Sequence, residues 1–265
     1  MEPFLKVQQR LQADNLDDQY RVDEYLLVSE FNNLLDIVFN SWGETVFDEF
    51  LNVLCQADVA KRLRTLKIGA QDFDGANGTR DWDFTKLVES DATFPNLLSL
   101  AIETYNNVEH NRPIISSSIG GFDYAEKGTL AKWLTKSPNL RFLSTPSAPD
   151  EMFFKRERHP LEYLVVQAGY ATENFILNFS QSDCFPNLQR LDYTDYDERY
   201  MEDYRQDCTP LEHFEQLFRS KAFAPVEAFT WCDPIFTSSQ LVSLKSLRPD
   251  LWFVVTHSSI EHVES

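Results

Sequence analysis

The segment Phe185–Tyr200 reads FPNLQRLDYTDYDERY and contains the pattern that decides the fold. A Pro-Asn pair is followed by three apolar residues, Leu188, Leu191 and Tyr193, in an L-x-x-L-x-hydrophobic arrangement. The last two alternate as side chains on one face of a strand do, and the first enters the same core from the preceding turn. Proline ends a preceding helix and favours extended backbone next to it. The segment therefore predicts a turn and then a short strand with one buried face.

The same pattern recurs along the chain. Three copies contain Pro-Asn-Leu, and six carry a proline near their start. The mean spacing is 31 residues, with gaps from 21 to 43. The first apolar residues of the copies are Leu34, Leu63, Leu97, Leu140, Leu161, Leu188, Val226 and Leu251. A recurrence of this kind predicts one supersecondary unit that is repeated and buries its apolar side against its neighbours.

Amphipathic segments between these strands predict helices. In the clearest one, Thr209–Phe218, we expect Thr209 to cap the helix and Pro210 to occupy its first turn. Further helices are predicted at Glu44–Leu63, Phe84–Val88, Leu130–Leu134 and Ser238–Leu247. Alternating strands and helices favour an α/β fold with a parallel sheet.

The Pro-Asn-Leu-x-x-Leu pattern and the strand spacing resemble those of irregular, long-repeat bacterial leucine-rich-repeat proteins, over roughly residues 30 to 257. The resemblance implies an α/β solenoid of about eight irregular units, with short parallel strands on the concave side and helices on the convex side. Residues 1–30 lack the repeat and are expected to form an N-terminal cap or edge strand, and residues 31–265 the solenoid. The usual repeat carries Asn or Cys just after the strand, whereas the corresponding positions of this chain are variable, which predicts less regular loops. Such proteins are mostly binding scaffolds.

The charge is strongly acidic, since 42 acidic residues against 24 basic residues give a net charge of −18. Such a surface repels nucleic-acid phosphates and anionic lipids, so neither nucleic acid nor membrane is an expected partner. It favours a basic protein partner, although acidity can also serve solubility alone.

The chain begins without the apolar core of a signal peptide, and it contains no run of ~20 apolar residues. Its four cysteines are widely spread with no C-x-x-C pair. These features predict a cytoplasmic protein with reduced thiols. We also expect the protein to be a monomer.

Chemical motifs are weak. Asp72, Asp74 and Asp83 fall at positions one, three and twelve of a calcium loop, but Ala76 and Asn77 occupy positions five and six, so a turn between repeats is the alternative. There is no histidine pair with zinc-site spacing, no nucleophile elbow and no phosphate loop. We therefore expect no enzymatic activity, no metal and no cofactor. An accessory subunit or an enzyme with a site on the rim loops is the alternative.

A partner is expected to meet the outward strand positions and the acidic loops that follow the strands. Phe142 and Tyr163 on adjacent strands predict an exposed aromatic patch. In the last strand the same counting places Phe253 and Val255 outward. The candidate partner-binding residues are Phe142, Tyr163, Asp192, Asp195, Tyr196, Asp197, Glu198, Tyr200, Arg190 and Glu103. The alternative for the loop is a solvated segment whose tyrosines fold back onto the repeat. The favoured hypothesis is a scaffold that acts as an immunity or inhibitor protein against a basic toxin.

Overall fold

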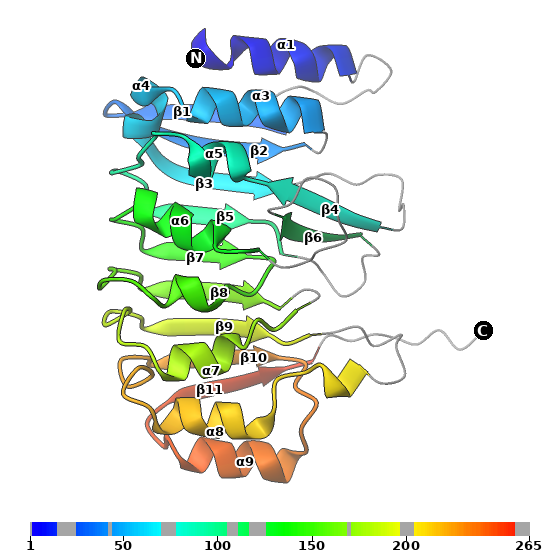
Figure 1. Cartoon of the computed structure of the whole chain (residues 1–265), viewed down its shortest axis with the longest axis vertical. Helices are drawn as coiled ribbons and strands as arrows, with labels where there is room; N and C mark the ends of the chain where they lie inside the picture. Colours follow the sequence, from blue (N-terminus) through cyan, green and yellow to red (C-terminus); the bar gives the residue numbers. More distant parts are fainter. Residues whose placement is uncertain are drawn as a thin grey trace, which may run out of the picture.

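The computed structural model describes residues 2–14, 25–41, 44–69, 78–104, 111–116, 126–168, 171–196 and 204–257. Within these ranges the chain is a mixed α/β protein built on a large, mostly parallel nine-stranded sheet (Figure 1). The order of strands in the sheet follows their order in the chain. The strands are β1 (Leu26–Phe31), β2 (Leu34–Asn40), β3 (Leu63–Gly69), β5 (Ser99–Ile102), β7 (Phe142–Thr145), β8 (Tyr163–Gln167), β9 (Arg190–Thr194), β10 (Ala228–Cys232) and β11 (Trp252–Thr256).

The eight strands predicted from the repeated pattern, β2 to β11 of this sheet, are confirmed as parallel neighbours. The remaining strand, β1, pairs antiparallel with β2. The leucine positions of the pattern align across the strands and form a continuous buried row. This row consists of Ile37, Leu66, Leu100, Leu143, Leu164, Leu191 and Phe229. Side-chain alternation along each strand therefore sends one face of the whole sheet into the core.

The turn before each strand is the same in five copies. The backbone N–H of the first apolar residue donates to the carbonyl three residues earlier, in the pairs Leu97–Phe94, Leu140–Ser137, Leu188–Phe185, Val226–Phe223 and Leu251–Arg248. Two of the Pro-Asn-Leu asparagines also link neighbouring turns. Asn96 Nδ2 donates to the Lys61 carbonyl at 2.7 Å, and Asn139 Nδ2 donates to the Pro95 carbonyl at 2.8 Å.

The helices between the strands lie in front of one face of the sheet in Figure 1. They are α3 (Glu44–Leu54), α4 (Ala57–Arg62), α5 (Thr85–Glu89), α6 (Thr129–Lys136), α7 (Phe175–Ser180), α8 (Leu211–Arg219) and α9 (Ser238–Ser246). Their buried side chains are rich in aromatic rings, such as Trp133 of α6 and Phe214 of α8. Phe214 stacks on Trp231 of β10 with a centroid distance of 3.8 Å, so aromatic contacts join the helix layer to the sheet.

At the N-terminal end of the sheet, η1 (Glu2–Phe4) and α1 (Leu5–Asp14) bury Phe4, Val7 and Leu11 in the common core. Helix α1 contacts α3, and β1 forms the edge strand. Residues 15–24, which carry most of the acidic N-terminal region, lie outside the described residues.

Two helix predictions were wrong. The predicted single helix Glu44–Leu63 is two helices, because Gln56 takes an extended conformation (φ −64°, ψ 130°) and Leu63 already opens β3. The predicted cap Thr209 does not cap α8, whose N-cap residue is Pro210. Thr209 Oγ1 donates instead to the carboxylate of Asp195. Thr209 thus forms a hydrogen bond with a residue 14 positions earlier in the chain, and it does not cap the helix that follows it.

The sequence pattern also did not predict α7 or a small two-stranded sheet. Strands β4 (Gly78–Asp83) and β6 (Asn111–Ser116) pair parallel to each other beyond the ends of β3 and β5 (Figure 1). Trp82 and Ile115 are buried in the core. Residues 70–77, which contain most of the calcium-like motif, lie outside the described residues. Its last member, Asp83, accepts a hydrogen bond from Thr85 N at 2.8 Å at the start of α5.

The predicted phase of the last strand was wrong by one residue. Phe253 is paired with Phe229, packs against the core and stacks on the Phe229 ring at 5.6 Å. The outward residues of β11 are Trp252, Val254 and Thr256. The reason is that this copy has one residue fewer between the buried turn residue Leu251 and the first inward strand residue.

Candidate protein-binding surface

The face of the sheet opposite the helices is the open face. Two rows of its residues, all half-buried or exposed, run across the strands. The first row contains Asp36, Thr65, Ser99, Phe142, Tyr163, Arg190, Ala228 and Trp252. The second contains Val38, Lys67, Ala101, Ser144, Val165, Asp192, Thr230 and Val254. Parallel sheets usually have both faces covered, so an open face of this size is unusual.

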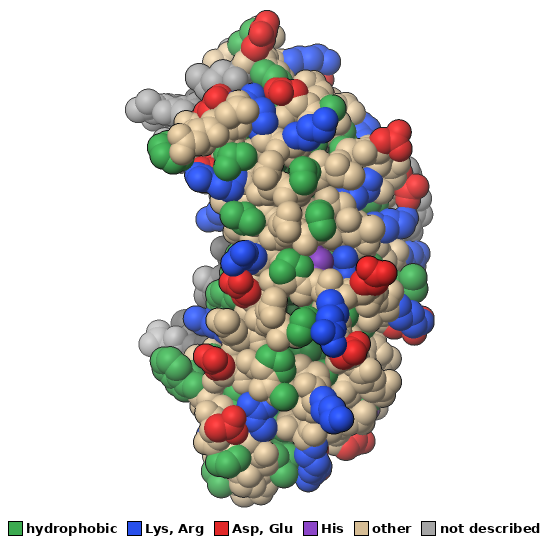
Figure 2. Space-filling model, turned by 90° about the vertical axis from the view of Figure 1, so that its left-hand side faces the viewer, with side chains coloured by type: hydrophobic (Ala, Val, Ile, Leu, Met, Phe, Trp, Pro, Cys, Tyr) green, Lys and Arg blue, Asp and Glu red, His purple; other side chains and the backbone are tan. Residues whose placement is uncertain are grey.

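The open face is curved. Figure 2 looks onto the edge at which the strands begin, and the outline of the molecule is hollowed on the side away from the helices. The floor of this hollow consists largely of small side chains, among them Ser99, Ala101, Ser144, Ala228 and Thr230. A floor of small residues allows another backbone to approach the sheet closely.

Four residues at the centre of the open face form what we call the Tyr163 cluster: Phe142, Tyr163, Arg190 and Asp192. The rings of Phe142 and Tyr163 meet edge to face with centroids 4.9 Å apart. Arg190 Cζ lies over the Tyr163 ring, 4.6 Å from its centroid. The same guanidinium donates twice to Asp192, at 3.0 Å and 2.9 Å, and the Tyr163 hydroxyl donates to Asp192 Oδ2 at 2.5 Å. Three neighbouring strands therefore hold the four side chains in one arrangement.

The electrostatics of the cluster follow from these contacts. Burial and, as a smaller cause, the hydrogen bond to Asp192 together raise the pKa of Tyr163 to about 12. The hydrogen bond from Arg190 to Asp192 raises the pKa of the guanidinium. Tyr163 is therefore a neutral donor at physiological pH. The Arg190 side chain is 49% exposed and Asp192 is 16% exposed, so the cluster presents an aromatic ring and part of a guanidinium to solvent.

Charges elsewhere on the open face are few. Arg64 donates to both carboxylate oxygens of Asp36, and Thr65 Oγ1 donates to Oδ1 at 2.8 Å. The hydrogen bond from Arg64 lowers the pKa of Asp36. Lys67 is exposed and has no ion pair with any described residue. The predicted contact residue Glu103 is half-buried, and its Oε2 lies close to Gly69.

The prediction that Asp195 is a partner-contact residue was wrong, because Asp195 does not lie on the surface. Its side chain is buried, and it accepts hydrogen bonds from Tyr196 N at 2.8 Å, Thr209 N at 3.0 Å and the Tyr193 hydroxyl at 3.1 Å. Burial raises the pKa of Asp195 to about 6. Asp195 therefore clamps the end of β9 to the start of α8. Its neighbour Tyr196 is partly buried and packs against the core.

The remaining predicted contact residues, Asp197, Glu198 and Tyr200, lie outside the described residues. The described ranges contain 28 of the 42 acidic and 22 of the 24 basic residues, so they account for −6 of the net charge of −18. Most of the acidic excess therefore belongs to segments about which the structure gives no placement.

Within the described residues, no group of three or more His, Cys, Asp or Glu side chains is arranged to hold a metal ion. A pocket of about 210 Å³ between α4 and the turn before β5 is lined by Cys55, Ala57, Ala60, Lys61, Ser90, Asp91, Ala92 and Thr93. All four cysteines are free thiols. None of the described helices has both the length and the apolar character to cross a membrane.

No protein-family model matches the chain, and no curated protein is significantly similar to it in sequence.

Proposed function

We propose that this protein is a non-enzymatic, protein-binding scaffold with the architecture of an irregular leucine-rich-repeat solenoid of about eight units. The turn hydrogen bond repeated in five copies and the strand order that follows the chain support the repeat architecture. In such an assembly each unit stabilises its neighbours, and the line of strands supplies an extended binding surface. The four free cysteines agree with a reducing, cytoplasmic location.

The observation that carries this proposal is the open face with the Tyr163 cluster at its centre. A half-buried aromatic pair on an open face, with a guanidinium over one ring and hydrogen bonds that already hold it, has the composition of a protein–protein hot spot. Because Arg190 and Tyr163 are fixed before binding, little side-chain entropy is lost when a partner docks.

We further propose that the partner is basic, and the sharpest form of this hypothesis is a basic toxin that the protein neutralises. The segments 70–77, 105–110, 117–125, 197–203 and 258–265, which follow strands of the two sheets, together contain ten acidic residues and one basic residue. These segments therefore supply much of the acidic excess in the sequence, and this excess favours a cationic partner. A field of this sign speeds the encounter with a cationic protein.

The experiment is affinity capture from the native cell, followed by calorimetry on the purified pair. We expect the wild-type chain to retain a basic polypeptide. The variants Phe142→Ala and Arg190→Ala should each weaken its binding by roughly 2 kcal/mol or more, about 30-fold. Glu212→Ala, at an exposed position on the helix side, is the matched control and should bind as the wild type does. Failure to retain any basic polypeptide, or equal binding by the open-face variants, would refute the proposal.

A further inference from the structure

Both ends of the sheet are edge strands. At the first end, β1 pairs with β2 only, and α1 adds its buried residues to the core. At the other end, β11 pairs with β10 only, and no other strand in the described ranges adjoins it. Two large apolar side chains are exposed here: Trp252 of β11 is 73% exposed and Val242 of α9 is 70% exposed. A stacked architecture needs a polar outer surface on its terminal unit. Val242 and Trp252 interrupt that surface, which otherwise exposes the serines Ser238, Ser239, Ser243 and Ser246 of α9.

The free edge of β11 carries unused backbone groups. Trp252 N donates to the Glu227 carbonyl at 2.8 Å, and Asp233 N donates to the Thr256 carbonyl at 2.8 Å. In a parallel pair, alternate residues direct both their N–H and C=O toward the same neighbour. Trp252, Val254 and Thr256 therefore face β10, and the N–H and C=O groups of Phe253 and Val255 face outward. Such an edge is a template for another strand.

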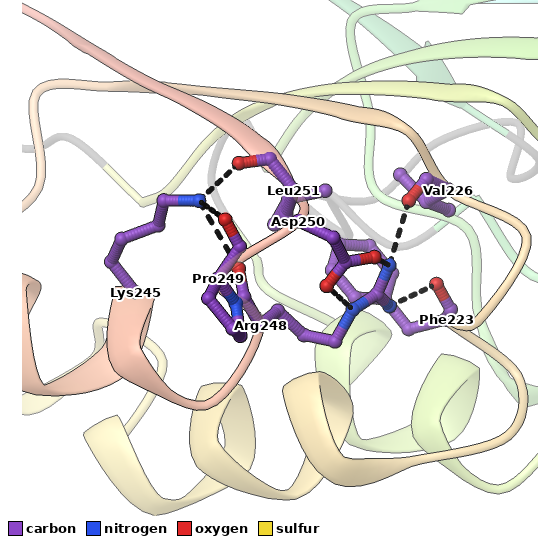
Figure 3. A network of polar contacts seen from close by, with 7 residues as sticks. All are labelled: Phe223, Val226, Lys245, Arg248, Pro249, Asp250 and Leu251. Carbon is purple, nitrogen blue, oxygen red and sulfur yellow. Dashed lines mark hydrogen bonds and ion pairs between the residues drawn. The ribbon is translucent and has the colours of Figure 1, made fainter.

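The charges at this end are engaged in internal contacts (Figure 3). Lys245 Nζ donates to the carbonyls of Arg248, Pro249 and Leu251. The guanidinium of Arg248 donates to the carbonyls of Phe223 and Val226 and pairs with both oxygens of Asp250. These three residues are the only charged ones in the segment 238–256. The end therefore has one acid and two bases in a chain whose total charge is −18.

We propose that β11 is a homodimerisation edge, at which two copies of this chain join their sheets across a two-fold axis. A two-fold axis perpendicular to the sheet makes the paired strands antiparallel. With the axis at Val254, Phe253 lies opposite Val255 of the second copy, and the outward N–H and C=O groups of both are satisfied. Two copies of an acidic chain repel each other, and the segment 238–256, with one acidic and two basic residues, adds little to that repulsion. This proposal replaces the expectation of a monomer and is independent of the proposed partner.

The geometry provides a specific test at Val254, because the two Val254 side chains face each other across the axis. Like charges directly opposite in an antiparallel pair are destabilising, and opposite charges are favourable. The chain has a mass of 30.8 kDa, so analytical ultracentrifugation of the full-length protein distinguishes monomer from dimer. We expect the wild type to sediment as a dimer, and Val254→Lys and Val254→Glu each to sediment as monomers. An equimolar mixture of the two variants should form a heterodimer.

Further variants separate edge pairing from loss of folding. Val255→Pro removes an outward N–H without breaking a bond to β10, and it should also give a monomer with an unchanged circular dichroism spectrum. Leu27→Lys, on the exposed face of the opposite edge strand β1, is the control and should leave the dimer intact. The proposal is overturned if the wild type is monomeric up to about millimolar concentration, if both charged variants stay dimeric, or if their mixture fails to associate.

Discussion

The guanidinium of Arg190 lies 4.6 Å above the ring of Tyr163, and the two side chains share the carboxylate of Asp192 as acceptor. This relationship joins β8 to β9 on the open face. It provides a rigid aromatic and cationic group without requiring a partner to order it. The stability and the titration of this cluster can be measured before any partner is known.

Replacing Asp192 by Asn should lower the pKa of Tyr163 from about 12 toward its ordinary value near 10. The pKa should not fall the whole way, because burial is the larger cause of the shift. Nuclear magnetic resonance of ring-labelled tyrosine as a function of pH measures the change, and Tyr163→Phe assigns the signal. Asp207→Asn, at an exposed site, is the control. An unchanged Tyr163 titration in Asp192→Asn would mean that the hydrogen bond contributes nothing in solution.

Removing the Asp195 carboxylate should destabilise the fold strongly. Asp195→Ala leaves the buried donors Thr209 N and Tyr196 N and the Tyr193 hydroxyl without their acceptor. We expect the free energy of unfolding to fall by roughly 2–4 kcal/mol. Urea unfolding monitored by circular dichroism measures the loss. The exposed Asp183→Ala should change stability by less than about 0.5 kcal/mol, and a similarly small effect at Asp195 would show that the clamp is not formed.

The titration of Glu126 should lower the free energy of unfolding as the pH rises. This fully buried carboxyl accepts hydrogen bonds from Leu130 N and Asp150 N, and burial raises its pKa from 4.5 to about 7. The folded state therefore binds the proton more tightly than the unfolded chain between these two pH values. Stability is lost across this window, on the order of 3 kcal/mol in total.

The test compares the pH dependence of unfolding in wild type and Glu126→Gln. The carboxamide cannot titrate, so its stability should decline less between about pH 5 and about pH 8, although it is less stable at low pH because one backbone donor loses its acceptor. Glu151→Gln, at an exposed position, should follow the wild-type curve. Parallel curves for wild type and Glu126→Gln would show that Glu126 titrates normally in the folded state.

The Pro-Asn-Leu turns provide a matched comparison of asparagines. Asn96 donates to the Lys61 carbonyl, whereas Asn187, at the equivalent place in its own copy, is exposed and has no hydrogen bond among the described residues. Asn96→Ala should therefore cost about 0.5–1.5 kcal/mol, and Asn187→Ala much less. Thermal or urea unfolding of the two variants gives the difference. Equal effects would mean that the asparagine acts only through its turn conformation.

The sequence alone determined where most strands begin and that they lie parallel. The reason is local: a proline turn followed by alternating apolar residues leaves a short strand only one way to bury its face, as Leu188, Leu191 and Tyr193 do. The aromatic pair Phe142 and Tyr163 followed from the same counting. The same counting gave the wrong orientation for Phe253. This copy has one residue fewer before the strand, and Phe253 pairs with the inward residue Phe229 of β10.

Only the tertiary structure decided that Asp195 is buried and hydrogen-bonded, and how the side chains around Tyr163 are arranged. In the sequence Asp195 is one acid among several, and its donor Thr209 is 14 residues away. The cluster likewise joins Tyr163 to Asp192, 29 residues apart. Burial and hydrogen bonding of a polar side chain depend on neighbours that the fold brings together from distant positions, and residue type or spacing does not encode them.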